Sequence, residues 1–181
     1  MSRPRILGGS ARGRELKTPR RGTRPTPAKV REAVFNSLQF RSGKFLDLFA
    51  GSGAMGLEAA SRGWEATSVE LARPAAAVIR DNARRLDLPL RVVCGDALAY
   101  VQEHGGFDVV FASPPYDLPG FEKLYAAIMR AAPVAPGGVY LFQHPSSLEL
   151  AAALADAVPD GAGLTERRYG NNTVTVVRTA V

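Results

Sequence analysis

Short, mostly apolar runs alternate along the chain with segments whose apolar residues recur at helical spacing. The first pattern is typical of buried strands, and the second defines one apolar face of a helix. Strands are predicted at 45–50, 65–70, 90–94, 107–112 and 139–143, and helices at 54–62, 73–86, 97–103, 121–132 and 147–157. Five strands alternating with helices predict an α/β fold with a doubly wound, mainly parallel sheet.

A further helix is expected before the first strand. We expect it to begin at Thr26-Pro27, with Thr26 as the N-cap and Pro27 in the first helical position. Apolar residues follow at four-residue spacing from Val30 and define a buried face. Lys29 and Arg31 are expected to add positive charge to the surface.

The chain closes with two strand-like runs, 163–168 and 173–178, separated by Tyr-Gly-Asn-Asn at 169–172. Glycine and asparagine tolerate the backbone conformations that tight hairpin turns require. This arrangement predicts a hairpin that adds antiparallel pairing to the parallel sheet.

Positive charge is concentrated at the start of the chain. Residues 1–24 contain eight basic side chains and one acidic side chain, a net charge of 8 − 1 = +7, whereas the other 157 residues contain 15 basic and 16 acidic, a net charge of −1. A concentrated patch favours a polyanionic partner, and an unstructured basic tail is the alternative. Two strand-capable runs joined by glycines favour a folded hairpin that presents arginines. We therefore expect a basic extension over residues 1–26 and one α/β domain over residues 27–181.

Composition is that of an ordinary globular protein of 181 residues, with 46% hydrophobic residues. No apolar run approaches the roughly 20 residues of a membrane helix, and the N-terminus lacks the apolar stretch of a secretory signal. Cys94 cannot form an internal disulfide, which fits a cytoplasmic protein, and its apolar run predicts a buried structural thiol. His104 and His144, expected at a solvated helix end and in a loop-capping role, offer with Cys94 no metal-ligand spacing, so we expect no metal.

A glycine turn joins the first strand of the sheet to the following helix. Gly51, Gly53 and Gly56 form the pattern G-x-G-x-x-G, which lets the backbone turn tightly and approach a ligand closely. Glu70 lies 19 residues past Gly51 at the end of the second strand, where a carboxylate can accept both ribose hydroxyls. Dinucleotide enzymes share this motif, so a nicotinamide-linked oxidoreductase is an alternative.

Two further carboxylates favour S-adenosylmethionine, which has an adenosine but no pyrophosphate. Asp96, just beyond the third strand, offers an acceptor for the adenine amine, and Asp47 is able to bind the glycine turn or face the ammonium group of the ligand. For both residues a capping role is the alternative. We also expect no separate substrate domain after the sheet.

Ser113-Pro114-Pro115-Tyr116 ends the fourth strand, beside the expected reversal of strand order. An aryl amine is a poor nucleophile because its lone pair is delocalised into the ring. The Ser113 hydroxyl and the Pro114 carbonyl can accept its hydrogens and favour the pyramidal, reactive nitrogen, while Tyr116 offers a flat face for a base. An ordinary Pro-Pro loop is the alternative. With the glycine turn, this corner predicts methyl transfer to an exocyclic nitrogen.

With these motifs, the chain resembles the RsmD family of bacterial small-subunit rRNA guanine-N2 methyltransferases, named for guanine 966 of 16S rRNA. The segments that carry the resemblance are 5–9, 12–14, 24–26, 30–36, 46–56 and 169–170. The resemblance implies a Rossmann-like class I methyltransferase fold, with a seven-stranded sheet that contains one antiparallel strand. It also implies S-adenosylmethionine as the methyl donor and an N-terminal extension that engages RNA.

The same resemblance implies roles for individual residues. Gly51, Gly53, Glu70 and Asp96 would line the cofactor, and residues 113–116 the target base. RNA phosphates would be contacted by Arg5, Arg12, Arg14 and Arg24. We expect the protein to act as a cytoplasmic monomer on 16S rRNA within a small-subunit particle.

The chain departs from the family at Ser113, where the family usually has Asp. Serine can accept a hydrogen bond from an amine but carries no charge, so the preferred base is open. The nearest alternative is an amino methyltransferase that acts on adenine N6 or on a protein glutamine. A nicotinamide-linked oxidoreductase and a non-catalytic RNA-binding module are more distant alternatives.

Overall fold

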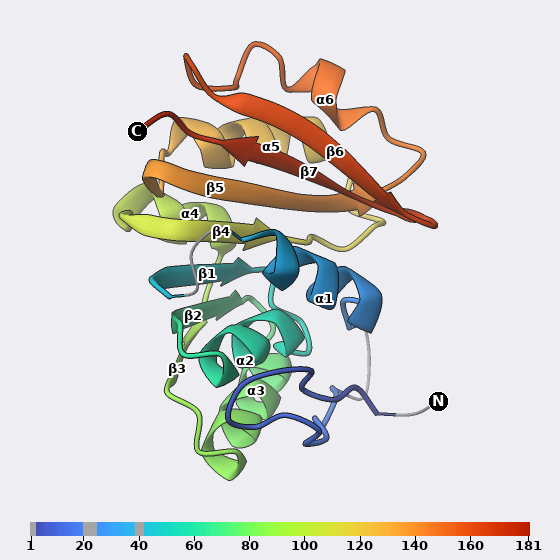
Figure 1. Ribbon diagram of the computed structural model, residues 1–181, viewed down its shortest axis with the longest axis vertical. Helices are drawn as coiled ribbons and strands as arrows, with labels where there is room; N and C mark the ends of the chain where they lie inside the picture. The colour runs from blue at the N-terminus through green and yellow to red at the C-terminus, as the bar shows by residue number, and fades with distance from the viewer. Residues whose placement is uncertain (1–2, 20–24, 39–41) are drawn as a thin grey trace.

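A seven-stranded sheet runs through the molecule with helices on both of its faces (Figure 1). The computed structural model describes residues 3–19, 25–38 and 42–181. The strands are β1 (Lys44–Leu48), β2 (Glu65–Glu70), β3 (Leu90–Cys94), β4 (Phe107–Ala112), β5 (Val134–Pro145), β6 (Gly163–Tyr169) and β7 (Asn172–Arg178). The helices are α1 (Ala28–Ser37), α2 (Ala54–Ser61), α3 (Arg73–Arg85), α4 (Ala97–Glu103), α5 (Phe121–Arg130) and α6 (Leu150–Ala153).

The strand order is β3-β2-β1-β4-β5-β7-β6. Strands β1 to β5 pair in parallel, whereas β7 pairs antiparallel with both β5 and β6. The predicted doubly wound sheet with one antiparallel strand is therefore confirmed. The chain order reverses between β1 and β4, and the crevice at such a reversal is where open α/β sheets bind ligands.

Successive residues of the central strands contribute to two hydrophobic clusters, one on each face of the sheet. In β4, Val109 and Phe111 belong to the cluster under α1 and α2, while Val110 and Ala112 belong to the cluster under α4 and α5. This alternation follows from the two-residue period of a strand. A sheet covered on both faces in this way leaves its strand ends as the accessible edge.

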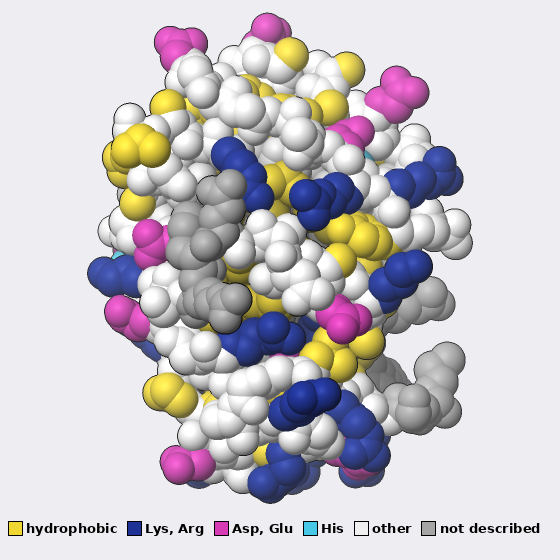
Figure 2. All heavy atoms as spheres, viewed as in Figure 1, with side chains coloured by type: hydrophobic (Ala, Val, Ile, Leu, Met, Phe, Trp, Pro, Cys, Tyr) yellow, Lys and Arg dark blue, Asp and Glu magenta, His cyan; other side chains and the backbone are white. Residues whose placement is uncertain are grey.

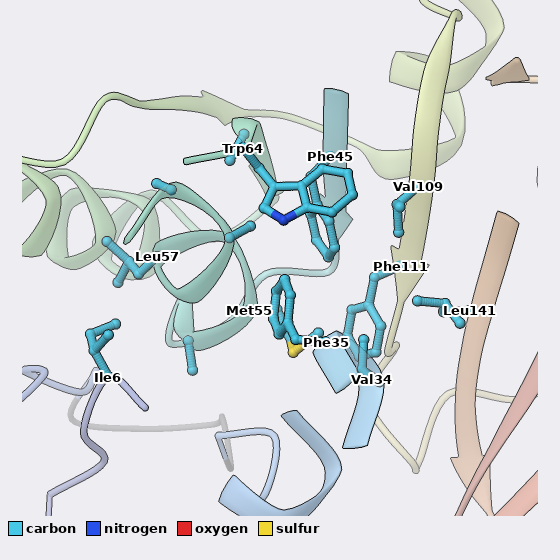
Figure 3. Packing of buried hydrophobic residues seen from close by; sticks show 14 of the residues in the cluster. Ile6, Val34, Phe35, Phe45, Met55, Leu57, Trp64, Val109, Phe111 and Leu141 are labelled. Carbon is cyan, nitrogen blue, oxygen red and sulfur yellow. The ribbon is translucent and has the colours of Figure 1, made fainter. Parts of the chain in front are cut away.

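Aromatic rings fill the first cluster between α1, α2 and the sheet (Figure 3). The Phe35 and Phe45 rings stack with centroids 5.5 Å apart, and Trp64 meets Phe45 edge-on at 5.8 Å. Ile6 of the N-terminal segment, residues 3–19, belongs to the same cluster. The segment is therefore packed against the α/β layer.

The N-terminal segment folds back on itself as a short hairpin. One antiparallel bridge joins Arg5 to Glu15, and the amide of Leu16 donates to the carbonyl of Pro4 at 2.8 Å. The expected hairpin is present, and the Ile6 amide also donates to the Arg14 carbonyl at 3.0 Å. Ala11 and Leu16 are buried with Ile6, so apolar side chains hold the segment in place.

A buried carboxylate fastens this segment to α2. The Glu58 side chain is fully buried and accepts the backbone amides of Leu7 and Gly8, each at 2.8 Å. The same carboxylate accepts Nε of Arg62 at 2.8 Å and lies 4.0 Å from Nε of Arg31. A buried charge persists only when it is paired and hydrogen-bonded, as it is here.

The structure corrects two expectations at the first helix. The helix begins at Ala28, with Pro27 rather than Thr26 in the N-cap position and no side-chain cap. The Thr26 carbonyl instead accepts a hydrogen bond of 2.7 Å from Arg31. Arg31 is buried, not part of the positive surface, because it lies on the same helix face as Val34 and Phe35 and pairs with Glu58.

Two elements differ from their predicted lengths by more than two residues. Regular helix α6 ends at Ala153, and three-residue turns such as Ala157 N to Leu154 O at 2.8 Å replace the rest of the expected helix. Strand β5 begins at Val134, five residues early, because it shifts register against β4. Gly138 lies at this shift, and a Cβ there would meet the Asp108 carbonyl oxygen at 2.7 Å.

The prediction that Cys94 is a buried thiol was wrong. Cys94 is exposed because β3 is an edge strand whose residues are only partly covered. Among the residues that the structure describes, no helix has the length and apolar character needed to cross a membrane.

We predict that Glu58→Gln lowers the free energy of unfolding by about 3 kcal/mol, because it leaves the buried Arg31 without its anion. Urea denaturation measures this change. Glu65→Gln, at an exposed glutamate of β2, is the control and should change stability by less than about 0.5 kcal/mol. Arg31→Met combined with Glu58→Gln should recover part of the loss, and a Glu58→Gln variant as stable as the wild type would contradict the role of this pair.

Candidate active site

A cavity of about 1590 Å³ opens at the carboxyl ends of the parallel strands. The arrows of β1, β4 and β6 in Figure 1 point to the same edge of the sheet. The cavity is lined both by Gly51 of the glycine turn and by the Ser113–Tyr116 corner. The two motifs separated by some 60 residues in sequence therefore share one cavity, and their chemical roles remain predictions.

The glycine turn adopts a left-handed backbone that glycine alone tolerates well. Gly51 has φ of 56° and Gly53 has φ of 76°. A Cβ at Gly53 would approach Ile79 to 2.8 Å, and a Cβ at Gly56 would approach the Ser68 hydroxyl to 2.0 Å. Local packing therefore favours glycine at positions 53 and 56, and of the three glycines Gly51 is the one that lines the cavity.

Glu70 binds the turn from the neighbouring strand. One carboxylate oxygen accepts the Gly51 amide at 2.7 Å, and the other accepts the Ala72 amide at 2.8 Å. Each oxygen keeps a second lone pair, so the same carboxylate can accept ribose hydroxyls. The predicted position of Glu70 at the cavity wall is observed, and its ligand role stays a prediction.

Asp47 lies buried beneath the turn and also lines the cavity. Its Oδ2 accepts the Gly56 amide at 3.0 Å and the Ser68 hydroxyl at 3.2 Å. Burial raises the pKa of Asp47 to about 7, although these two hydrogen bonds act in the opposite direction. Of the alternatives that the sequence left open, contact with the turn is thus observed.

Asp96 caps a helix and lines the cavity at the same time. It is the N-cap of α4, and its Oδ1 accepts the Ala99 amide at 2.8 Å. The capping alternative is therefore observed, and the second carboxylate oxygen is left for other partners.

Hydrogen bonds join the Ser113–Tyr116 corner to β1, β5 and β7. The Ser113 amide donates to the Leu48 carbonyl of β1 at 3.4 Å. The Tyr116 hydroxyl donates to Oδ1 of Asn172 at 2.5 Å and accepts Nε2 of Gln143 at 3.3 Å. Burial raises the pKa of Tyr116, yet 45% of the residue is exposed, so its ring can still receive a ligand.

Sequence reasoning missed the far wall of the cavity, to which Gln143, Arg168 and Asn172 contribute. Gln143 is the polar last residue of the apolar run predicted as strand 139–143, and this position is a signal that could have identified it. Its Oε1 is buried and accepts no hydrogen bond from the described residues. Arg168 and Asn172 looked like ordinary hairpin residues, and only the sheet order brings them here.

His144, expected as a loop cap, is instead buried in the sheet. Its Nε2 lies 2.8 Å from the Thr175 hydroxyl, and burial lowers its pKa. It is absent from the lining of the cavity formed by the described residues.

The predicted RNA-contacting arginines are not equivalent. Arg5 pairs with Glu15 and donates to the Gly13 carbonyl at 2.9 Å, so its charge is partly neutralised. Arg12 and Arg14 are exposed and form no ion pair with any residue in the described ranges. Arg24 lies outside the described residues. The segment that follows it, residues 25–27, lines the cavity.

Comparison with known proteins agrees with this geometry. Residues 4–178 match the family model described as Conserved hypothetical protein 95. The chain is 34% identical over 164 residues to the putative rRNA methyltransferase YlbH of Bacillus subtilis, a match that covers 85% of this chain and 89% of that protein. It is 41% identical over 118 residues to ribosomal RNA small subunit methyltransferase D of Escherichia coli, covering 62% of this chain and 60% of that protein.

A solved structure is similar over the whole length. The putative methyltransferase yhhF from Escherichia coli superposes with a TM-score of 0.84 at 29% identity, and the match covers 99% of each chain. The fold is that of class I S-adenosylmethionine methyltransferases, and the chain belongs to the RsmD family.

Proposed function

We propose that the protein transfers a methyl group from S-adenosylmethionine to the exocyclic N2 of a guanine in 16S rRNA. The observation that carries the proposal is the single cavity lined by both the glycine turn and the Ser113–Tyr116 corner. Membership of the RsmD family and the names of its relatives support rRNA as the substrate class.

The residues at the β1–β3 end of the cavity fit S-adenosylmethionine. Glu70 and Asp96 present carboxylate oxygens for the ribose and the adenine amine, and the glycine turn leaves its backbone open to the amino-acid end. Asp47 adds a carboxylate that can face an ammonium group. When bound, the cofactor supplies an electrophilic methyl group on a sulfonium.

The acceptor corner holds the amine. The Ser113 hydroxyl and the Pro114 carbonyl accept its hydrogens and keep the nitrogen lone pair out of conjugation with the base, while the Tyr116 ring supports the base from one side. Positioning of this kind contributes about 7–11 kcal/mol where the geometry is good. No strong base is required before attack, because the methylated ammonium loses its proton readily.

An unpaired acceptor favours guanine over adenine. Phe142 of β5 pairs with Ala112, the last residue of β4, so the next residues along the two chains, Gln143 and Ser113, lie beside each other. Guanine carries an N1–H beside its N2 amine, whereas adenine has no hydrogen at N1. The unpaired Oε1 of Gln143 is buried, so an incoming base would have to uncover it; it would then accept the N1–H of guanine and be repelled by the N1 lone pair of adenine.

The N-terminal segment supplies the RNA-binding surface in this proposal. Residues 1–26 would form the RNA-binding extension, residues 27–181 the methyltransferase domain, and a single copy of the chain the working enzyme on a small-subunit particle. Exposed Arg12 and Arg14 carry charge that no described residue neutralises. Residues 25–27 line the cavity and also a neighbouring pocket that includes Arg3 and Arg5 of the N-terminal segment.

Incubation with labelled S-adenosylmethionine and undermethylated small subunits tests the proposal. Nucleoside analysis should find N2-methylguanosine in 16S rRNA. Label in N6-methyladenosine or in a protein glutamine would identify the alternative acceptors, and label on neither RNA base nor protein would end the proposal.

We predict that Tyr116→Ala lowers kcat about 30-fold, because base stacking contributes roughly 2 kcal/mol, and leaves RNA affinity nearly unchanged. Single-turnover kinetics and filter binding measure the two quantities. Tyr116→Phe keeps the ring and loses only the contacts to Asn172 and Gln143, so it should retain most of the activity. Equal losses of turnover and affinity in Tyr116→Ala would contradict this role.

We predict that the affinity for S-adenosylhomocysteine rises about tenfold between pH 6 and 8. With a pKa of about 7, Asp47 is mostly protonated at the lower pH, and the ionised form is the one that attracts an ammonium group. Calorimetry measures the affinity, and Asp47→Asn should remove the dependence. A wild-type affinity that is flat over this range would show that Asp47 does not face the charged group.

We predict that Arg12→Ala combined with Arg14→Ala weakens RNA binding and lowers the slope of log K against log salt by about 1.5, as expected for two lost phosphate contacts. The kcat at saturating RNA should stay unchanged. Arg91→Ala combined with Arg130→Ala removes two exposed charges elsewhere and serves as the control. Substitution is preferable to truncation because Ile6 and Leu16 are part of the core. Equal effects of the two double variants would argue against a specific RNA surface.

A further inference from the structure

The cavity extends past the Ser113–Tyr116 corner to the C-terminal hairpin. Its wall there is formed by the end of β5 and by the turn between β6 and β7, and includes Ser146, Arg168 and Asn171. The base, as placed above, reaches Gln143 in this wall, but neither the base nor the cofactor uses Ser146, Arg168 or Asn171.

Charge is divided between the two ends of the cavity. Asp47, Glu70 and Asp96 line the end formed by β1–β3, and Asp117 follows the acceptor corner. Among the described residues that line the cavity, Arg168 is the only basic residue. Strand β6 lies four strands from β1, about 19 Å at the usual strand spacing, so Arg168 is remote from the glycine turn.

The Arg168 guanidinium is available for an external anion. Its Nε donates to the Gly170 carbonyl at 3.2 Å, which orients the side chain along the hairpin turn. It forms no ion pair with any described residue, unlike Arg5, and it is exposed. A planar guanidinium with free N–H groups matches the geometry of a phosphate.

The position of the hairpin relates Arg168 to the acceptor corner. The Tyr116 hydroxyl contacts Asn172, and the strand partner of Asn172 is Tyr169, the residue after Arg168. Asn172 and Arg168 both line the cavity, so the sugar–phosphate of a base stacked on Tyr116 would have Arg168 on the side away from the cofactor carboxylates.

We propose that this end of the cavity is a phosphate subsite, in which Arg168 binds a phosphodiester next to the extruded nucleotide of the RNA. The inference rests on the proposed function and adds an RNA contact outside the N-terminal segment. RNA then spans the cavity, with phosphates held by the N-terminal arginines on one side and by Arg168 on the other. Figure 2 shows Lys and Arg side chains both over the lower part of this face, where the N-terminal segment lies, and over the upper part, where the C-terminal strands lie.

Arg167 provides a matched control. It is also exposed and precedes Arg168 in β6, so its side chain projects from the opposite face of the sheet and does not line the cavity. Arg167→Ala and Arg168→Ala remove the same charge from neighbouring positions, and any difference between them reports a local contact rather than the overall field.

The experiment compares both variants for binding to undermethylated small subunits over a range of salt concentrations. Arg168→Ala should raise Kd about fivefold at ~0.1 M salt and lower the slope of log K against log salt by about 0.7. Arg168→Lys should keep the slope, and Arg167→Ala should change Kd less than about twofold. A methylphosphonate in place of the phosphodiesters beside the target nucleotide should weaken RNA binding by the wild type. It should not weaken binding by Arg168→Ala any further.

Two results would overturn the inference. One is Arg168→Ala behaving like Arg167→Ala in Kd and slope. The other is a loss of S-adenosylhomocysteine affinity in Arg168→Ala by calorimetry, which would assign the arginine to the cofactor. Because binding is measured without turnover, these results are separate from a failure of the proposed function, which would appear as a wild-type enzyme that leaves the guanine unmethylated.

Discussion

The pairing of β1 with β4 is the constraint on which the rest of this structure depends. Leu48 pairs with Ala112, the last residues of the two strands, so the glycine turn and the acceptor corner begin at the same level of the sheet. The Ser113 amide also donates to the Leu48 carbonyl. Backbone hydrogen bonds therefore set the separation of the two loops, and side chains such as Glu70 and Tyr116 act on loops whose places are already defined.

A second set of contacts joins the basic N-terminal segment to this frame. Glu58 accepts the amides of Leu7 and Gly8, while Arg31 donates to the carbonyls of Arg5 and Thr26. Thr26 lines the cavity, so one buried ion pair contacts both the surface proposed for RNA and the cavity wall. Such a pair contributes little net stability relative to apolar residues, and its value here lies in fixing one geometry.

The strands and most helices could be predicted because burial on both faces of a sheet imposes a simple apolar pattern, seen in β2 and β4 at their observed bounds. The errors have a common cause in tertiary context. Arg31 is charged yet buried because a partner from α2 meets it, and Cys94 sits in an apolar strand yet is exposed because that strand is at the edge. Gln143, Arg168 and Asn172 share the cavity wall only because β7 lies between β5 and β6, an order that no local pattern encodes.

That insertion of the last strand also bears on the order in which the protein can fold. The free edge of β5 stays open until β7 is available, since the sequence-distant pair Val139 and Arg178 closes it. During synthesis β5 emerges from the ribosome before β7 does, so a sheet of β1 to β5 has an unpaired edge until β7 is available. Synthesis thus completes the acceptor side last, and a nascent chain that already has its glycine turn still lacks the wall against which a base is held.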